Sequence, residues 1–184
     1  DEITGRLEAA GHAVNRISVP GREQIAEAHG VIVLSEAGEI YSELTETERE
    51  QLGKAAISGL RHADNLSVEA IDAAWDWAKA AADRIQTMLE PIDLLISPTL
   101  PITPPRRDSS RAILRGEKVP LVVAMTILTC LANLTGNPVI SLPNPLSAAT
   151  PKTGLQLMGT LGGDESLLQQ ALQIQHDLAD VGRT

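Results

Sequence analysis

Nucleophilic side chains occur in this 184-residue sequence, but none lies in a spacing that makes a reactive serine or cysteine site. The pair Ser109-Ser110 lies between Arg107 and Arg111 without glycines beside it, and no G-x-S-x-G stretch is present. We therefore expect a solvated loop there. Cys130, the single cysteine, falls in an apolar stretch without a nearby His or Lys, which predicts a buried structural thiol, with a pocket-lining role as the alternative.

Metal, phosphate and acid–base sites are also not indicated by the spacing of the polar residues. The histidines are scattered without an H-x-x-x-H pair that could hold zinc on one helical face: His12, His29, His62 and His176. Residues 159–163 are glycine-rich but lack the lysine of a phosphate loop, so they predict a plain turn. The glutamates at 46, 48 and 50 are interpreted as a solvated face. We expect no metal and no cofactor.

The composition is that of an ordinary globular protein or part of one. Hydrophobic residues make up 43% and charged residues 21%, which argues against a disordered or fibrous chain. The net charge of −9, the 2% aromatic content and the absence of a basic stripe beyond Arg106-Arg107 argue against nucleic-acid binding. A lone cysteine favours a reducing compartment, so a cytoplasmic location is expected.

Two features bear on membranes and on the ends of the chain. Residues 119–134 are apolar but shorter than the ~20 residues that a bilayer requires, so a buried helix is predicted rather than a membrane span. The sequence begins Asp-Glu-Ile without a basic and apolar leader, so no signal peptide is expected and the natural start is expected upstream.

The first half of the chain is predicted to be mostly helical. Residues 13–19 alternate apolar and polar side chains up to Pro20-Gly21, which predicts a short strand. Helices are expected over residues 23–44 and from Thr45 to His62. The clearest element starts at Ser67, an N-cap residue, and keeps helical apolar spacing to Pro91.

The second half is predicted to contain strands and helices in alternation. Residues 92–97 and 139–142 are apolar runs typical of strands buried on both faces, and residues 154–158 are expected to pair with the latter. The proline-rich residues 98–111 predict an extended surface connection, and Asp164 is expected to cap a final helix. Four strands do not complete a sheet of this kind, so the remaining strands are expected from an upstream region or another chain.

Four short motifs in the second half occur in a specific order. They are PTLP at 98–101, TCLANLTGNPVISLP at 129–143, GLQLMG at 154–159 and DESLL at 164–168. In order and spacing they resemble the C-terminal third of the amidase signature enzymes. The resemblance implies an α/β fold, the C-terminal part of the amidase signature fold, with a mixed β-sheet flanked by helices. Residues 1–184 would then form a C-terminal segment whose catalytic core lies upstream of residue 1.

The family resemblance implies hydrolysis of a carboxamide C–N bond by a serine nucleophile, a second serine on a cis peptide and a lysine. In the family these three belong to a Gly/Ser-rich region, and no such stretch occurs in this sequence. No catalytic role is therefore carried onto the residues that could be mistaken for them: Ser97, Ser109, Ser110 and Lys79. We expect the chain to be inactive alone, and to associate with an upstream catalytic half or with itself. A small amide would be the substrate of the complete enzyme.

By the same resemblance, Thr129, Cys130 and Asn133 are candidate substrate-pocket residues. A neutral lining suits an uncharged acyl group that gains affinity from burial. The alternative for Asn133 is that it merely caps the helix before Gly136.

Two other functions remain open from the sequence. In glutamine-dependent tRNA amidotransferases, the amidase-like subunit tends to carry an acidic residue seven positions before the motif asparagine. Here that position holds Thr126, which weighs against this alternative without removing it. The other possibility is a non-catalytic scaffold or binding domain.

Overall fold

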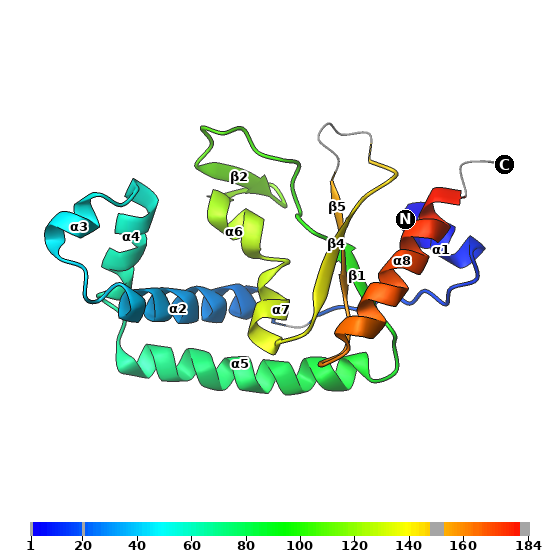
Figure 1. Cartoon of the computed structure of the whole chain (residues 1–184), viewed down its shortest axis with the longest axis horizontal. Helices are drawn as coiled ribbons and strands as arrows, with labels where there is room; N and C mark the ends of the chain where they lie inside the picture. The colour runs from blue at the N-terminus through cyan, green and yellow to red at the C-terminus, as the bar shows by residue number, and fades with distance from the viewer. Residues whose placement is uncertain (1, 20, 148–152, 181–184) are drawn as a thin grey trace.

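A three-stranded sheet lies between two groups of helices and forms the centre of the fold (Figure 1). The computed structural model describes residues 2–19, 21–147 and 153–180. The sheet consists of β1 (Leu95–Pro98), β5 (Gly154–Met158) and β4 (Val139–Pro143), in the order β1-β5-β4, and both pairings are antiparallel. The predicted pairing of residues 154–158 with residues 139–142 is therefore confirmed.

The register of the sheet sorts its side chains onto two faces. Leu157 of β5 lies opposite Ile96 and Ile140, and one residue earlier Gln156 lies opposite Ser97 and Ser141. Because alternate residues of a strand point to opposite faces, the leucines of β5 face one side, and Gln156 and Met158 face the other.

The first face is covered by two helices from opposite ends of the chain. These are α1 (Glu2–Ala9) and α8 (Asp164–Asp180), which lie next to each other in Figure 1. Leu155 and Leu157 form a buried cluster with Leu7 of α1 and with Leu167 and Leu178 of α8. The final helix was predicted, although Asp164 is its first residue and not the residue before it.

A hydrogen bond just beyond α1 also joins the two ends of the chain. The His12 Nε2 lies 2.8 Å from Asp177 Oδ2 on α8, and the Arg6 guanidinium donates to the Leu178 carbonyl at 3.5 Å. The hydrogen bond from His12 is the largest cause that holds the pKa of Asp177 below its usual value. These contacts fix α1 on α8 although the sequence separates them by more than a hundred residues.

The second face is covered by α2 (Arg22–Ile40), α5 (Val68–Leu89) and α7 (Cys130–Thr135). Met158 of β5 packs in a buried cluster with Ile25, Leu89 and Cys130, one from each helix. The long helix α5 begins as predicted, because the Ser67 side chain accepts a hydrogen bond from the Ala70 backbone N–H at 3.2 Å. This N-cap satisfies one of the free N–H groups of the first turn.

The helix predicted from Thr45 to His62 is instead two helices, α3 (Glu46–Glu50) and α4 (Lys54–Ala63). Thr45 begins α3 with a reciprocal capping box in which its hydroxyl accepts from the Glu48 N–H and the Glu48 carboxylate accepts from the Thr45 N–H. Gly53, in an extended conformation before α4, interrupts the helical path. The two helices project from one end of the body (Figure 1).

The strand predicted at residues 13–19 is not observed. This segment is extended, but within the described residues it has no strand beside it that could accept its backbone hydrogen bonds. Its apolar side chains contribute in another way, since Val14 packs against the α8 side of the sheet and Val19 against the α7 side. The alternation of apolar and polar residues reflects this packing and not a ladder.

Residues 111–120 also differ from the prediction. They form a hairpin of β2 (Arg111–Leu114) and β3 (Glu117–Pro120). The predicted loop reached residue 111 and the predicted helix began at residue 119, and no strand was expected between them. The turn consists of Arg115 and Gly116 with φ of 52° and 87°, and positive φ at both positions is the geometry of a two-residue hairpin turn.

The neutral stretch after the hairpin is helical, as predicted, but it is divided into α6 (Leu121–Thr126) and α7. The Thr129 N–H donates to the Thr126 carbonyl at 2.9 Å, which is a three-residue turn and so interrupts the α-helical pattern. Gly136, in the left-handed region with φ of 72°, ends α7.

The outer strands of the sheet are only half covered within this chain. Burial along β4 alternates, and Val139 is 38% exposed, whereas strands buried on both faces were expected. Among the described residues β1 and β4 are the edges of the sheet. Of the strands in the described residues, β5 alone has buried side chains on both faces.

Candidate functional site

Three of the sequence motifs meet at one end of the sheet, through Thr99, Ser141 and Gly154. The Thr99 backbone N–H donates to the Gly154 carbonyl at 3.0 Å, just beyond the end of β1. The Thr99 and Ser141 hydroxyls are hydrogen bonded to each other. The segments PTLP, TCLANLTGNPVISLP and GLQLMG, which are far apart in sequence, therefore contribute adjacent backbone and hydroxyl groups.

Gly154 is favoured at this junction because there is no room for a side chain, and not because its backbone has a positive φ. A Cβ placed on Gly154 would lie 2.9 Å from the Thr99 Cβ and 3.0 Å from the Ser141 Oγ. Real Cβ atoms essentially never lie closer than 3.0 Å to another atom, so a larger residue at this position requires Thr99 and its neighbours to shift.

Gln156 connects this end of the sheet to the start of α7. Its side chain is 5% exposed, and its Nε2 donates to the Leu128 carbonyl at 3.2 Å and to the Ser97 Oγ at 3.4 Å. Leu128 lies in the turn between α6 and α7. The amide of Gln156 thus joins the sheet to the residue directly before Thr129.

The three candidate pocket residues lie together on or beside α7, but their side chains have different environments. Thr129 is half-buried, and its hydroxyl donates to the Thr126 carbonyl at 3.2 Å. Cys130 is 0% exposed. The exposed Asn133 amide lies 3.3 Å from the His29 Nε2 on α2. Asn133 therefore links α7 to α2, and the C-cap position is occupied by Gly136.

The environment of Cys130 keeps its thiol protonated. Burial raises its pKa to about 11, so the thiolate that would act as a nucleophile is scarce at neutral pH. Burial also lowers the pKa of His29, which keeps that imidazole neutral beside Asn133. The helices α6 and α7 themselves contain no charged residue type.

The serines and the lysine that were assigned no catalytic role lie on separate elements. Ser97 is in β1 and accepts a hydrogen bond from Gln156. Ser109 and Ser110 precede the β2–β3 hairpin. The side chain of Lys79 on α5 is 75% exposed, with its Nζ 4.0 Å from the Asp76 carboxylate.

Metal clusters and membrane-spanning helices are both absent from the described ranges. In residues 2–19, 21–147 and 153–180, no group of three or more His, Cys, Asp or Glu residues is arranged to hold a metal ion. In the same ranges, no helix has the length and apolarity needed to cross a bilayer.

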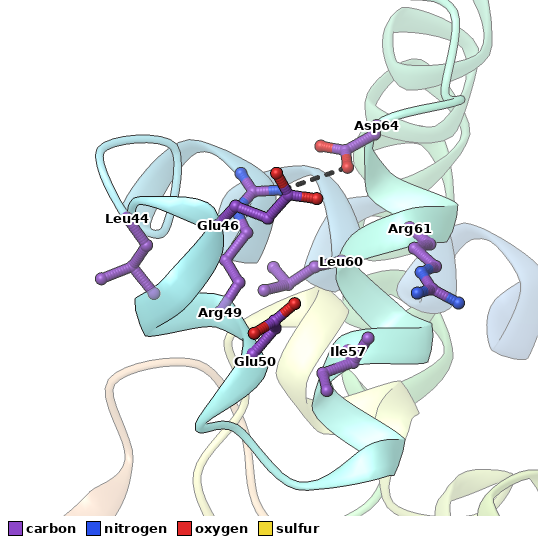
Figure 2. Close-up of a pocket in the computed structure, with 8 residues that line it drawn as sticks. All are labelled: Leu44, Glu46, Arg49, Glu50, Ile57, Leu60, Arg61 and Asp64. Atoms are coloured by element: carbon purple, nitrogen blue, oxygen red, sulfur yellow. Dashed lines mark hydrogen bonds and ion pairs between the residues drawn. The ribbon is translucent and has the colours of Figure 1, made fainter.

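A cavity of about 420 Å³ lies between α3 and α4, away from the motifs (Figure 2). Its wall combines apolar with acidic and basic side chains: Leu44, Glu46, Arg49, Glu50, Ile57, Leu60, Arg61 and Asp64. Arg49 closes one side through its ion pair with Asp64 at 3.2 Å and its hydrogen bond to the Tyr41 carbonyl at 3.3 Å. The glutamates of α3 remain exposed, which confirms their interpretation as a solvated face.

Sequence reasoning did not single out Thr99, Ser141 or Gln156 as individual site residues. Each lies inside one of the family motifs, so the motifs marked the segments that contain them. The spacing of these residues does not resemble that of a reactive site. Their proximity depends on β1 lying beside β5, which the sequence does not specify, as well as on the predicted pairing of β5 with β4.

Comparison with known proteins agrees with the motifs. The family model described as Amidase matches residues 1–168. The A subunit of the glutamyl-tRNA(Gln) amidotransferase from Natronomonas pharaonis is 30% identical over 92% of this chain and 44% of its own length. The corresponding protein from Cenarchaeum symbiosum is 37% identical over 51% of this chain and 18% of its own length.

Solved structures show the same fold. A crystal structure of an amidase superposes with a TM-score of 0.88 at 22% identity, over 97% of this chain and 42% of that one. The 6-aminohexanoate cyclic dimer hydrolase, solved with its substrate, superposes with a TM-score of 0.73 at 24% identity. The match covers 99% of this chain and 41% of that chain. The chain spans less than half the length of these relatives. From its family match, its motifs and its fold, this chain belongs to the amidase family.

Proposed function

We propose that the chain is the C-terminal portion of an amidase-type hydrolase of carboxamide C–N bonds. In this proposal residues 1–184 supply sheet strands, the flanking helices and one wall of the substrate cleft. The catalytic serines and lysine come from an upstream half that completes the enzyme. The observation that carries the proposal is the meeting of three amidase motifs at one end of a sheet, around Gly154 and the Thr99–Ser141 hydrogen bond.

The outer strands of the sheet support an upstream half as the partner. Within the described residues β1 and β4 have a strand on one side only, and Val139 of β4 is 38% exposed. Unpaired backbone groups on an edge strand can pair with another chain. Covering them is expected to stabilise the chain, either with the upstream half or, without it, with a second copy.

The chain alone is expected to release no ammonia from aliphatic or aromatic carboxamides, and to resist labelling by a fluorophosphonate directed at reactive serines. Mixing it with a separately produced upstream half should restore both activities. Sedimentation across a concentration series should show the isolated chain self-associating and the mixture forming a one-to-one complex. Stoichiometric labelling of a serine in the isolated chain would contradict the proposal. A well-behaved, cooperative monomer that the upstream half neither binds nor activates would favour a non-catalytic scaffold.

We also propose that the start of α7 borders the substrate cleft. The support is the uncharged sequence of α7, which holds Asn133 and has Thr129 as its N-cap, next to a sheet end where three family motifs meet. An uncharged wall of this kind favours an acyl group that is held by burial. Cys130 lies behind this wall, since its side chain is 0% exposed.

In the completed enzyme, Thr129→Tyr is expected to reduce kcat/KM for bulky amides by about tenfold more than for small ones, since its half-buried side chain adds volume at the cleft wall. Comparing kcat/KM over amides of increasing acyl length measures this effect. Thr160→Tyr, an exposed position in the turn after β5, is the matched control and should leave selectivity unchanged. Equal losses for every substrate with Thr129→Tyr would contradict the cleft assignment.

A glutamine-dependent amidotransferase is the second candidate. The curated relatives named above, glutamyl-tRNA(Gln) amidotransferase A subunits, favour it. Against it, the position where an acidic residue is expected to hold the glutamine amine is Thr126, whose hydroxyl donates to the Val122 carbonyl at 2.9 Å. Release of glutamate from glutamine by the completed enzyme, at a rate above that with simple amides, would favour the amidotransferase.

A further inference from the structure

In the part of the chain that the structure describes, buried polar side chains are few, and they lie around one helix. Among the described residues the buried polar side chains are Thr135, Asn137 and Gln156, each exposed by 6% or less. Thr135 belongs to α7 and its hydroxyl donates to the Leu131 carbonyl at 3.0 Å. Gln156 forms a hydrogen bond just before the first residue of that helix, and Asn137 forms one just after its last residue. Burying an amide is costly unless its hydrogen bonds are made, so their concentration here calls for an explanation.

Gln156 acts at the beginning of α7. It lies on β5, the middle strand, and its amide donates to the Leu128 carbonyl at 3.2 Å, two residues before the helix starts. Because the strand is fixed on both sides by β1 and β4, its side chain provides a rigid point of attachment for the turn.

Asn137 acts at the end of α7, one residue after Gly136. Its Nδ2 donates to the carbonyl of Gly159, the residue that follows β5, at 2.8 Å. Its Oδ1 accepts from the Gln86 Nε2 of α5 at 3.0 Å. The Gly159 N–H donates back to the Pro138 carbonyl at 3.0 Å. Both ends of α7 are therefore tied to β5 by side-chain amides.

Apolar packing alone would not fix this helix in one place. Cys130 and Leu131 pack in the same cluster as Met158, but α7 has only six residues and apolar contact is non-directional. Hydrogen bonds to buried groups impose direction and distance, so they select one register. A displacement of about 1 Å in a substrate-positioning group can cost about a hundredfold in rate.

We propose that Gln156 and Asn137 are positioning residues that hold α7 against β5 and thereby set the shape of the substrate cleft beside Thr129. The cleft part of this inference rests on the proposed function. The positioning part concerns contacts within this chain and can be tested without activity.

The single cysteine provides the probe for the first test. Cys130 is 0% exposed, so a thiol-reactive disulfide such as dithionitrobenzoate reaches it only when α7 moves away. Gln156→Met replaces the amide with an apolar side chain of similar length and so removes both donated hydrogen bonds. We expect Cys130 to react about tenfold faster in this variant because the local opening of α7 costs less. Asn137→Ala leaves the side chains of the sheet unchanged and should have the same effect on Cys130. It replaces Gln156→Met in the test if that variant does not fold.

The control is Leu157→Val, which removes buried volume at the neighbouring position of the same strand. Its side chain faces α8, on the opposite side of the sheet from α7. The variants are compared in denaturant concentrations that give each the same unfolded fraction. Cys130 should then react faster only in the Gln156 and Asn137 variants. Reaction rates equal to that of Leu157→Val would overturn the positioning proposal.

The second test uses the chain completed with its upstream half. Gln156→Met is expected to raise KM for bulky amides by about tenfold while kcat for the smallest amide changes by less than about twofold. A loss of kcat and kcat/KM that is equal for all amides would overturn the cleft part of the inference. Absence of activity in the unmodified complex would refute the proposed function, and the reactivity of Cys130 would still decide whether the amides position α7.

Discussion

Replacing Leu157 with alanine is expected to lower the free energy of unfolding by about 3 kcal/mol. The side chain is 0% exposed and lies in the middle strand, opposite Ile96 on one side and Ile140 on the other. It packs beneath α8 and α1, so the cavity left by its removal would be enclosed by elements from both ends of the chain. Urea unfolding followed by circular dichroism, in the presence of the upstream half if the isolated chain self-associates, measures this difference.

Leu172→Ala is the matched control for Leu157→Ala. Leu172 lies on α8 but is 68% exposed, so its replacement should change the unfolding free energy by less than about 0.5 kcal/mol. Similar losses at both positions would indicate that α8 does not pack on the sheet through the face described. A large loss at Leu172 alone would show that a second copy or the upstream half covers that exposed side.

The sequence predicted best the elements whose local signals agree with their packing. In α5 the N-cap Ser67 and the apolar spacing both mark the helix, and Ala78, Ile85 and Leu89 of that spacing are buried. The first half of the predicted apolar face is not buried, since Val68 is 69% and Trp75 41% exposed. The strands β4 and β5 were predicted from short apolar runs bounded by prolines and glycines, and they pair directly. Here local propensity and tertiary packing favour the same structure.

Elements were missed where one pattern fits two structures. The alternation at residues 13–19 is produced by an extended connection that packs Val14 and Val19 on opposite sides of the sheet. The Arg115-Gly116 turn requires positive φ in a non-glycine residue, which a sequence indicates only weakly. The separation of α6 from α7 is accompanied by the hydrogen bond from Gln156 to Leu128, between residues distant in sequence.

The sequence predicted which segment contains the candidate site, but not how the side chains of that segment are arranged. Thr129, Cys130 and Asn133 were singled out because a family motif contains them, and the structure places them on one short helix end. The burial of Cys130 was predicted from its apolar surroundings and is confirmed, since its side chain is 0% exposed. The contact of Asn133 with His29 on α2 was not indicated by any spacing. The role of Gln156 could not be seen either, because a glutamine in an apolar strand reveals its hydrogen-bond partners only when the fold is known.

Gly154→Ala is expected to lower the free energy of unfolding by about 2 kcal/mol, since overpacking costs about 1–3 kcal/mol and here the added methyl meets groups on both neighbouring strands. Gly30→Ala is the opposite case. Gly30 is in α2 with nothing within 4 Å of an added Cβ, so the same substitution should stabilise the chain by about 1 kcal/mol. Thermal unfolding of the two variants under identical conditions tests whether the two substitutions change the stability in opposite directions.

The effect of Gly154→Ala should extend from the sheet to α7. The methyl would push β5 away from Thr99 and Ser141, and Gln156 lies only two residues further along the strand. Moving that amide weakens its hydrogen bond to the Leu128 carbonyl, so Cys130 should react faster with a thiol reagent in Gly154→Ala than in Leu157→Val at equal unfolded fraction. If Gly154→Ala destabilises the chain but leaves Cys130 as protected as in Leu157→Val, the sheet end and α7 are not mechanically coupled. The shared position of the motifs would then stabilise the sheet without shaping the cleft.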